Sequence, residues 1–513
     1  MNKRYLFWVI FFIISVAVFL RSAFAIQFQV ALNDFWTVFY YARNISLSEP
    51  ASWQNSLFPV GYATLLATFP VQHAIRLAFL LNIGLVSLFV TAVAALTLSD
   101  NNLVRPILTF LVAISFPLVF RYGNTVGPDI GTAAWVALGI FFLWYRHLSE
   151  KQLPSNLWQD VLAGICLGLA SLWRSHGAAI SFSMLGFYAL LFGLQNFWER
   201  KWLWITFLVI GSVQGFVNLA AGYSFFESAQ YLNLYKTFYG NDWYTFPTGS
   251  TNALFWELIL TQPGNVVETL WPFYWSVAQY AWTGLALFIA AHNTNPNLRK
   301  YGLFVTLSIA LYAGPVSFGS SPRAPLPVLA LSFSALAFSI TEILVRIKQV
   351  LTSRPALWYA FLTIPVFLLG LYLYQSLQTN TEFIKTYSHQ HETYAGVERK
   401  LRETGLTSPD QVFTTNFNFY LPYMAPHQPR FNGGWDVVIM YKFRRQYPEL
   451  PVTSWEKFSQ ACREQGIRFL VLTPNSADLA DFLGEIYKEE NIPANLQKLG
   501  KRGNQLMLML LEK

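Results

Sequence analysis

Residues 5–20 read YLFWVIFFIISVAVFL and contain no charged side chain. A helix needs roughly 20 mainly apolar residues to cross about 30 Å of hydrocarbon, so this stretch, continued to residue 25, is long enough for one membrane span. Comparable apolar runs follow near 72–98, 103–121, 130–146, 158–174, 178–195, 202–221, 269–291, 301–318, 325–345 and 356–376. The sequence therefore predicts an α-helical polytopic membrane protein with about eleven transmembrane helices.

The composition indicates the same fold class. Hydrophobic residues make up 54% of the chain and charged residues only 12%, whereas an average soluble chain is about 25% charged. The net charge of +8 does not indicate nucleic acid binding, because the basic residues occur as singles and pairs between apolar runs. Cys166 and Cys462 show no spacing typical of a metal site or a disulfide framework.

The first apolar run also resembles a secretion signal, because Lys3 and Arg4 precede it and SAFA at 22–25 resembles a small-x-small cleavage site. We favour an uncleaved membrane anchor for two reasons. The run is long for a signal core, and Arg21 interrupts the approach to the cleavage site. Either interpretation places residue 26 outside.

The distribution of basic residues predicts the orientation. With the N-terminus in the cytoplasm, twelve of the nineteen Lys and Arg residues among the first 378 fall in inner segments. An odd number of spans then places the C-terminal tail on the outer side. We expect an integral protein of the bacterial inner membrane with an extracytoplasmic tail.

The tail, residues 379–513, differs in composition from the membrane part, residues 1–378. It holds fifteen acidic and sixteen basic residues, against twelve and nineteen in the much longer membrane part. Short apolar stretches alternate in it with amphipathic ones, which predicts a small soluble α/β domain. We expect strands near 411–414, 467–472 and 505–510 and helices near 383–403, 454–465 and 476–490.

Charged side chains near the outer ends of several spans form a candidate site. Asp34 lies in the first outer loop, and Asp129 lies between the third and fourth spans. Arg174 ends the fifth span, His176 follows it, and Arg323 begins the tenth span. Charged groups are costly at a bilayer boundary unless they have a partner or a function.

Each of these residues also has a purely structural interpretation. Asp34 and Asp129 would each favour the start of a helix. Arg174 and Arg323 would extend to lipid phosphates, and His176 would be a hydrogen-bonded interfacial residue. For each residue taken alone, the sequence leaves both interpretations open.

Together, two carboxylates and two guanidinium groups on one aqueous face suggest a specific reaction. A carboxylate accepts the proton of an attacking hydroxyl or amine. Arginines, or a divalent cation such as Mg²⁺ or Mn²⁺ held by carboxylates, stabilise charge on a phosphate leaving group. The combination fits group transfer from a lipid phosphate.

The order of the motifs resembles a known family. Along the chain come Arg21, then Asp34 with Tyr40-Tyr41-Ala42, FPVGY at 58–62, RLAFLLN at 76–82, GPDI at 127–130 and RAPLP at 323–327. Over residues 1 to about 378, this order resembles the GT-C membrane glycosyltransferases. These polyprenyl-phosphate-sugar-dependent enzymes are related to protein O-mannosyltransferases and to the aminoarabinose transferase of lipid A.

The resemblance implies roles for individual residues. Asp34 would be the catalytic carboxylate and Asp129 a second acid that organises the site, and both are candidate metal ligands. Asp34 is a single acid where many relatives carry an acidic pair, which leaves metal use open. An arginine at position 174 replaces the lysine often found there, which leaves donor specificity open. The candidate substrate-binding residues are Arg174, His176, Arg323, Tyr41 and Arg76.

The sequence thus predicts a membrane glycosyltransferase that moves a sugar from a polyprenyl-phosphate donor to an extracytoplasmic lipid, glycan or protein acceptor. Membrane lipids would surround it, and no nucleic acid partner is expected. The alternatives are a transporter of lipid-linked sugar or polysaccharide and a non-catalytic membrane scaffold. Transporters place binding groups near the bilayer midplane, and a scaffold needs no clustered charges.

Overall fold

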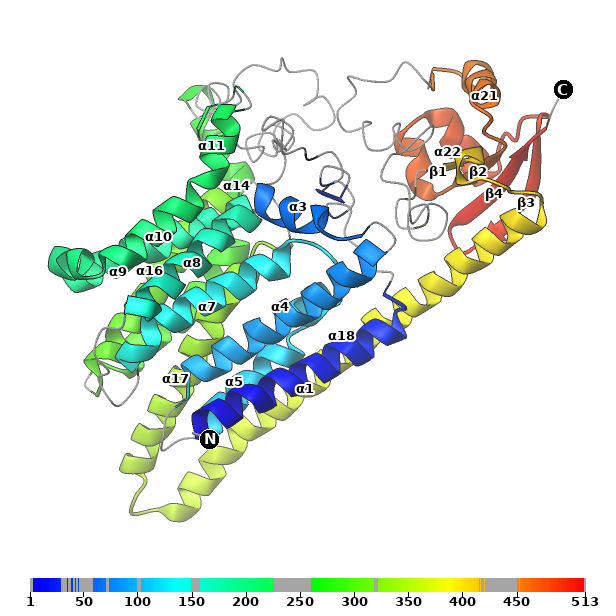
Figure 1. The fold of residues 1–513 in the computed structure, drawn as a ribbon. Helices are drawn as coiled ribbons and strands as arrows, with labels where there is room; N and C mark the ends of the chain where they lie inside the picture. The colour runs from blue at the N-terminus through cyan, green and yellow to red at the C-terminus, as the bar shows by residue number, and fades with distance from the viewer. Residues whose placement is uncertain are drawn as a thin grey trace.

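The computed structural model has two parts, a large helical bundle and a small C-terminal sheet (Figure 1). The N-terminus lies at the end of the bundle opposite the sheet (Figure 1). Apart from a few isolated residues between these ranges, the structure describes residues 3–28, 59–70, 73–98, 103–148, 157–220, 260–292, 294–317, 322–414 and 453–511.

Every predicted apolar run lies on a helix or on a broken helix pair. Among the described residues, six helical segments are long and apolar enough to cross a membrane, and one bent pair makes up to seven. These helices fit the predicted spans in length and composition, and the number eleven stays a prediction. The bundle helices are α1 (Lys3–Ala25), α4 (Ala74–Leu96), α5 (Val104–Ser115), α6 (Pro117–Gly123), α7 (Asp129–Leu148), α8 (Leu157–Trp173), α9 (Ser175–Glu199), α10 (Lys201–Gly211), α11 (Val213–Ala220), α14 (Pro263–Ala278), α15 (Trp282–Ala290), α16 (Pro296–Ser317), α17 (Leu326–Val350) and α18 (Pro355–Glu403), with the short α3 (Val60–Ala67) at one end.

The run at 103–121 is not one straight helix. It forms α5 and α6, which are bent by 62° relative to each other. Phe116 between them is extended, with φ −60° and ψ 122°, and Pro117 begins α6. Proline has no N–H and disfavours the helical conformation of the residue before it, so the break is encoded locally.

Glycines allow several helices to approach closely. A Cβ atom on Gly164 of α8 would lie 2.5 Å from the carbonyl oxygen of Leu203 in α10. A Cβ atom on Gly284 of α15 would lie 2.6 Å from the carbonyl oxygen of Gly302 in α16. Small residues at helix crossings are typical of membrane bundles, where packing rather than the hydrophobic effect drives association.

Helix α1 packs against the rest of the bundle. Phe19 is fully buried, and its ring lies 5.8 Å from that of Phe120 in α6. A Cβ atom on Gly123 would lie 2.6 Å from the Phe19 ring. Removal of α1 would therefore expose part of the bundle interior.

Helix α18 joins the bundle to the tail. It runs without interruption from Pro355 to Glu403 and reaches the sheet (Figure 1). The predicted domain boundary at residue 378 therefore falls inside a continuous helix that combines the expected span at 356–376 with the expected helix at 383–403. The division into domains 1–378 and 379–513 stays a prediction.

The tail contains a four-stranded sheet with the order β1-β2-β4-β3. Strand β1 pairs parallel with β2, and β4 pairs antiparallel with both β2 and β3. Phe413, Phe458, Leu470, Leu483 and Leu508 belong to its hydrophobic core. The elements are β1 (Val412–Thr414), α21 (Trp455–Glu464), β2 (Phe469–Leu472), α22 (Asp481–Lys488), β3 (Leu496–Arg502) and β4 (Gln505–Leu510).

These elements confirm the expected strand and helix alternation, with one addition. Strand β3 was not predicted, because its sequence, LQKLGKR, is rich in charge and mostly solvent-exposed. Charged residues are a common feature of edge strands, where they discourage pairing with other chains.

The orientation can be tested on two exposed residues of α18 and the turn before it. We expect a cysteine at Thr386 to react with an impermeant thiol reagent in intact cells, and a cysteine at Ser353 to react only after permeabilisation. Both cysteines are introduced into a variant in which the native Cys166 and Cys462, which are buried, have been replaced. The opposite labelling pattern would reverse the predicted topology.

Candidate active site

Three of the predicted site residues meet in one cluster. Asp129 is the first residue of α7, Arg174 lies between α8 and α9, and Arg323 lies shortly before α17. Nε of Arg174 is 3.0 Å from Oδ1 of Asp129. Nη1 of Arg323 donates to Oδ2 of Asp129 over 3.2 Å. The two carboxylate oxygens therefore each face a different guanidinium group.

This cluster is buried. The side chains of Asp129 and Arg174 are 6% and 7% exposed, and that of Arg323 is 18% exposed. Arg174 and Arg323 thus turn towards a carboxylate and are largely withdrawn from the surface. Buried ion pairs contribute little net stability, because desolvation offsets their attraction. The burial of this cluster is therefore weak evidence for a stabilising role.

The position of Asp129 serves both interpretations proposed from the sequence. A carboxylate in the first turn of α7 interacts favourably with the helix dipole. The same carboxylate holds two cations that are 45 and 194 residues away in the chain. The three side chains together carry a formal charge of +1, which suits an anionic ligand.

An asparagine holds the turn that leads to Asp129. Nδ2 of Asn82, on α4, donates to the carbonyl oxygens of Tyr122 and Thr125 over 3.0 and 2.9 Å. Nδ2 of Asn124 donates to the carbonyl oxygen of Phe120 over 2.9 Å. Asn82 belongs to the RLAFLLN motif, and sequence reasoning assigned it no role.

Tyr62 is a second residue that sequence reasoning did not assign. It is 1% exposed, and its ring lies 5.5 Å from that of Trp173. Burial, followed by the nearby Asp129 carboxylate, raises the pKa of Tyr62 well above its ordinary value, so the phenol stays protonated. The glycine of the FPVGY motif could have drawn attention to Tyr62. A Cβ atom on Gly61 would lie 2.7 Å from the carbonyl oxygen of Leu172, so this segment packs closely against the end of α8.

The remaining predicted residues are not part of the described cluster. His176 is buried at the start of α9, two residues after Arg174. Arg76 is exposed in the first turn of α4. Asp34 and Tyr41 lie outside the described residues. Their roles stay predictions.

A metal ion does not fit the described surroundings of Asp129. Both of its carboxylate oxygens face guanidinium groups, which repel a cation. Within the described ranges, no group of three or more His, Cys, Asp or Glu side chains is arranged to hold a metal. Metal binding by Asp34 lies outside this test and stays a prediction.

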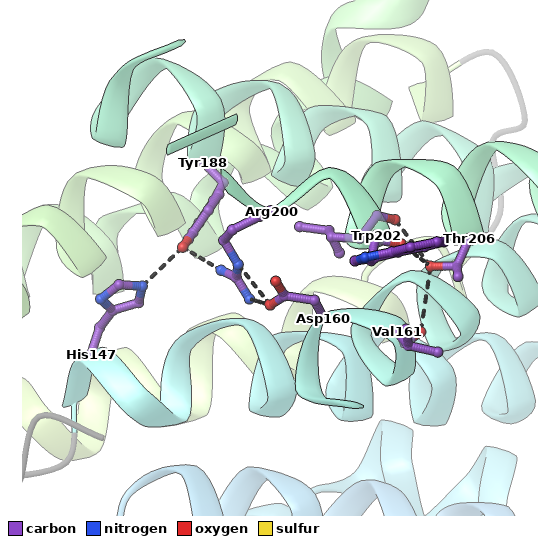
Figure 2. A network of polar contacts seen from close by, with 8 residues as sticks. His147, Asp160, Val161, Tyr188, Arg200, Trp202 and Thr206 are labelled. Atoms are coloured by element: carbon purple, nitrogen blue, oxygen red, sulfur yellow. Dashed lines mark hydrogen bonds and ion pairs between the residues drawn. The ribbon is translucent and has the colours of Figure 1, made fainter. Parts of the chain in front are cut away.

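The other end of α7 carries a separate polar network, shown in Figure 2. Nε of Arg200 donates to Oδ1 of Asp160 over 2.8 Å, and Nη1 of Arg200 donates to the Tyr188 hydroxyl. That hydroxyl lies 2.9 Å from Nε2 of His147. His147 is eighteen residues from Asp129 along α7, or about 27 Å at 1.5 Å per residue. The network therefore ties α7, α8 and α9 together far from the candidate site.

We expect Asp160→Asn to destabilise the protein without a direct effect on the candidate site. Loss of one partner from a buried ion pair costs about 3–5 kcal/mol, because the other charge stays buried. The thermal midpoint in detergent should fall clearly, and Arg200→Met added to Asp160→Asn should restore part of it. Glu268→Gln, at an exposed carboxylate of α14, is the control. A midpoint for Asp160→Asn equal to that of the parent would contradict a structural role.

Comparison with solved structures bears on the fold. No family model matches this chain, and no curated protein matches it. The crystal structure of ArnT from Cupriavidus metallidurans in the apo state matches over 98% of this chain and 97% of its own, at 13% identity and a TM-score of 0.52. The chain has the fold of ArnT. This finding confirms the fold implied by the resemblance to the aminoarabinose transferase.

Two further structures resemble the chain less closely. ArnT bound to undecaprenyl phosphate covers 98% of both chains at 13% identity, with a TM-score of 0.47. The archaeal oligosaccharyltransferase AglB from Archaeoglobus fulgidus, in complex with an inhibitory peptide and a dolichol-phosphate, matches 93% of this chain and 71% of its own. Its identity is 12% and its TM-score 0.41.

Proposed function

We propose that this protein is a membrane glycosyltransferase that moves a sugar from a polyprenyl-phosphate donor to an extracytoplasmic lipid, glycan or protein acceptor. The Arg174–Asp129–Arg323 cluster carries the proposal, because it offers two guanidinium groups in a buried setting. The fold shared with ArnT supports it independently. The charge pattern supports an orientation with this site on the outer side, and we place the protein in the bacterial inner membrane.

The charge of the cluster suits the proposed leaving group. The donor carries one negative charge on its phosphodiester, whereas the released polyprenyl phosphate is a monoester with a charge of about −1.5 to −2 at pH 7. Negative charge therefore grows on the phosphate as the bond to the sugar breaks. Preorganised cations stabilise such charge more in the transition state than in the ground state, which accelerates the reaction.

Asp129 is best assigned as a positioning residue. Its two oxygens hold Arg174 and Arg323 at 3.0 and 3.2 Å, so both guanidinium groups are oriented before the donor binds. Both oxygens of Asp129 therefore already face a guanidinium group before an acceptor binds. The base of the reaction is therefore a different residue.

Asp34 is the proposed base. In this reaction, an acceptor oxygen or nitrogen forms a bond to the anomeric carbon of the sugar, and the bond from that carbon to the phosphate oxygen breaks. The electron pair of the broken bond stays on polyprenyl phosphate. The proton of the acceptor passes to the Asp34 carboxylate. No metal ion is required for this balance.

A transfer assay tests the proposal. The purified protein in liposomes receives polyprenyl-phosphate donors with a radiolabelled sugar, together with lipid, glycan or peptide acceptors. We expect label to move to one acceptor class with equimolar release of polyprenyl phosphate, at a rate above an enzyme-free control. Donor that crosses the vesicle membrane intact, with no acceptor labelled, would favour transport and contradict the proposal.

A further inference from the structure

Helix α18 supplies hydrogen bonds at the break between α5 and α6. Pro117 has no N–H to donate to the carbonyl oxygen of Ala113, which interrupts the regular helical ladder, although the carbonyl oxygen of Val112 still accepts from the N–H of Phe116 over 3.1 Å. Nδ2 of Asn380 donates to the carbonyl oxygen of Ser115 over 2.9 Å. The hydroxyl of Tyr372 donates to the carbonyl oxygen of Val112 over 3.0 Å.

Asn380 is buried at this contact, and Tyr372 is half-buried. Asn380 is only 6% exposed, although its neighbours Thr379 and Thr381 on α18 are exposed. The ring of Phe383, about one turn further along α18, lies 6.3 Å from that of Phe120 in α6. Helix α18 therefore contacts both sides of the bend.

The bend determines where Asp129 lies. Helix α6 ends at Gly123, and only a short turn separates it from Asp129 at the start of α7. Asn82 holds this turn at the carbonyl oxygens of Tyr122 and Thr125. A change in the direction of α6 would therefore pull on the turn that places Asp129 between its two arginines.

The same helix is anchored in the tail. The Tyr394 hydroxyl of α18 accepts a hydrogen bond from Nδ2 of Asn416 over 2.9 Å, and the Arg502 guanidinium of β3 packs against Gly396. Tyr394 is fourteen residues beyond Asn380, or about 21 Å along a helix. One continuous helix thus links the tail sheet to the bend.

We propose that Asn380 and Tyr372 are positioning residues, through which α18 sets the bend between α5 and α6 and thereby the place of Asp129 between Arg174 and Arg323. The kinetic part of this proposal rests on the proposed glycosyltransferase function. The structural part concerns only the direction of α6.

The kinetic test uses three variants and a matched control. Asn380→Leu removes the donor, Asn380→Gln keeps an amide, and Tyr372→Phe removes only the hydroxyl. Since misplacement of reacting groups by about 1 Å costs on the order of a hundredfold, we expect Asn380→Leu to lower kcat/KM for the donor by about tenfold or more. The KM for the acceptor should not change. Asn380→Gln should recover part of the loss, Tyr372→Phe should lose less, and Thr379→Leu should match the parent.

The structural test needs no activity. Spin labels are attached to cysteines that replace Arg121 of α6 and Thr386 of α18, both exposed. The measurement gives the distance between the two labels in the full-length protein, in which Cys166 and Cys462 have been replaced. We expect one narrow distance distribution in the parent and in Thr379→Leu, and a shifted or broadened distribution in Asn380→Leu.

The two tests separate the two proposals. An unchanged distance distribution in a monodisperse Asn380→Leu variant would overturn the positioning role. Equal loss of activity in Asn380→Leu and Asn380→Gln, with KM values unchanged, would also overturn it. That pattern would mean that a smaller fraction of the protein molecules is folded and active. A parent that transfers no sugar, with the distance change present, would overturn the glycosyltransferase function and support the structural part.

Discussion

Arg323→Gln should lower kcat/KM for a polyprenyl-phosphate sugar by about a hundredfold or more. Loss of one preorganised donor to a developing oxyanion typically costs 10²–10³ in rate, on the order of 3–4 kcal/mol. Arg323 is the more accessible of the two arginines, with 18% of its side chain exposed against 7% for Arg174. Its replacement should therefore affect the site more than the fold.

Lysine substitutions sharpen this prediction. Arg323→Lys and Arg174→Lys keep the charge but lose the planar fork that suits phosphate oxygens. Both should weaken donor binding more than acceptor binding, and Arg323→Lys should retain more activity than Arg323→Gln. Arg121→Gln, at an exposed arginine of α6 that is not in the cluster, is the matched control. Donor affinity unchanged in both lysine variants would contradict the phosphate assignment.

Asp34→Asn should abolish most turnover while the protein stays folded. A positioned base contributes about 10²–10⁴ in rate, whereas loss of a helix cap costs about 1 kcal/mol of stability. The variant should therefore run as a monodisperse species, bind the donor like the parent and transfer sugar at least a hundredfold more slowly.

Asp129→Asn provides the contrast. This variant leaves Arg174 and Arg323 without their shared carboxylate, so it should weaken donor binding and lower stability together. Loss of turnover with unchanged donor binding in Asp34→Asn would identify a base. Weaker donor binding in Asp129→Asn would identify a positioning residue. Near-parental activity in a folded Asp34→Asn protein would instead support the capping role and remove Asp34 from the mechanism.

The helices were predictable because the bilayer imposes a strong and local constraint. A span needs roughly 20 apolar residues, and the backbone must satisfy its hydrogen bonds within the helix. Each predicted apolar run accordingly lies on a helix or a broken pair, including the run at 72–98 on α4 and the run at 325–345 on α17. Edge strand β3 was not predicted, because its sequence is rich in charged residues and lacks the alternation of apolar and polar residues typical of a strand.

The candidate site was predictable only as a set of residues at the ends of spans. Isolated charges stand out in an apolar chain, so Asp129, Arg174 and Arg323 could be selected one by one from the rule that such charges are costly. Nothing local distinguished an arginine directed to lipid from one directed to a carboxylate.

The sequence alone therefore determines where the helices lie and which charged residues stand out. Both depend on local properties, namely the length of each apolar run and the cost of a charge beside the bilayer. The pairing of both arginines with Asp129 depends on how α7, α8 and α17 pack, since the partners lie 45 and 194 residues from Asp129. The same holds for Asn380, whose amide meets Ser115 across 265 residues. Such contacts arise from packing over the whole bundle, and no pattern of spacing along the chain encodes them.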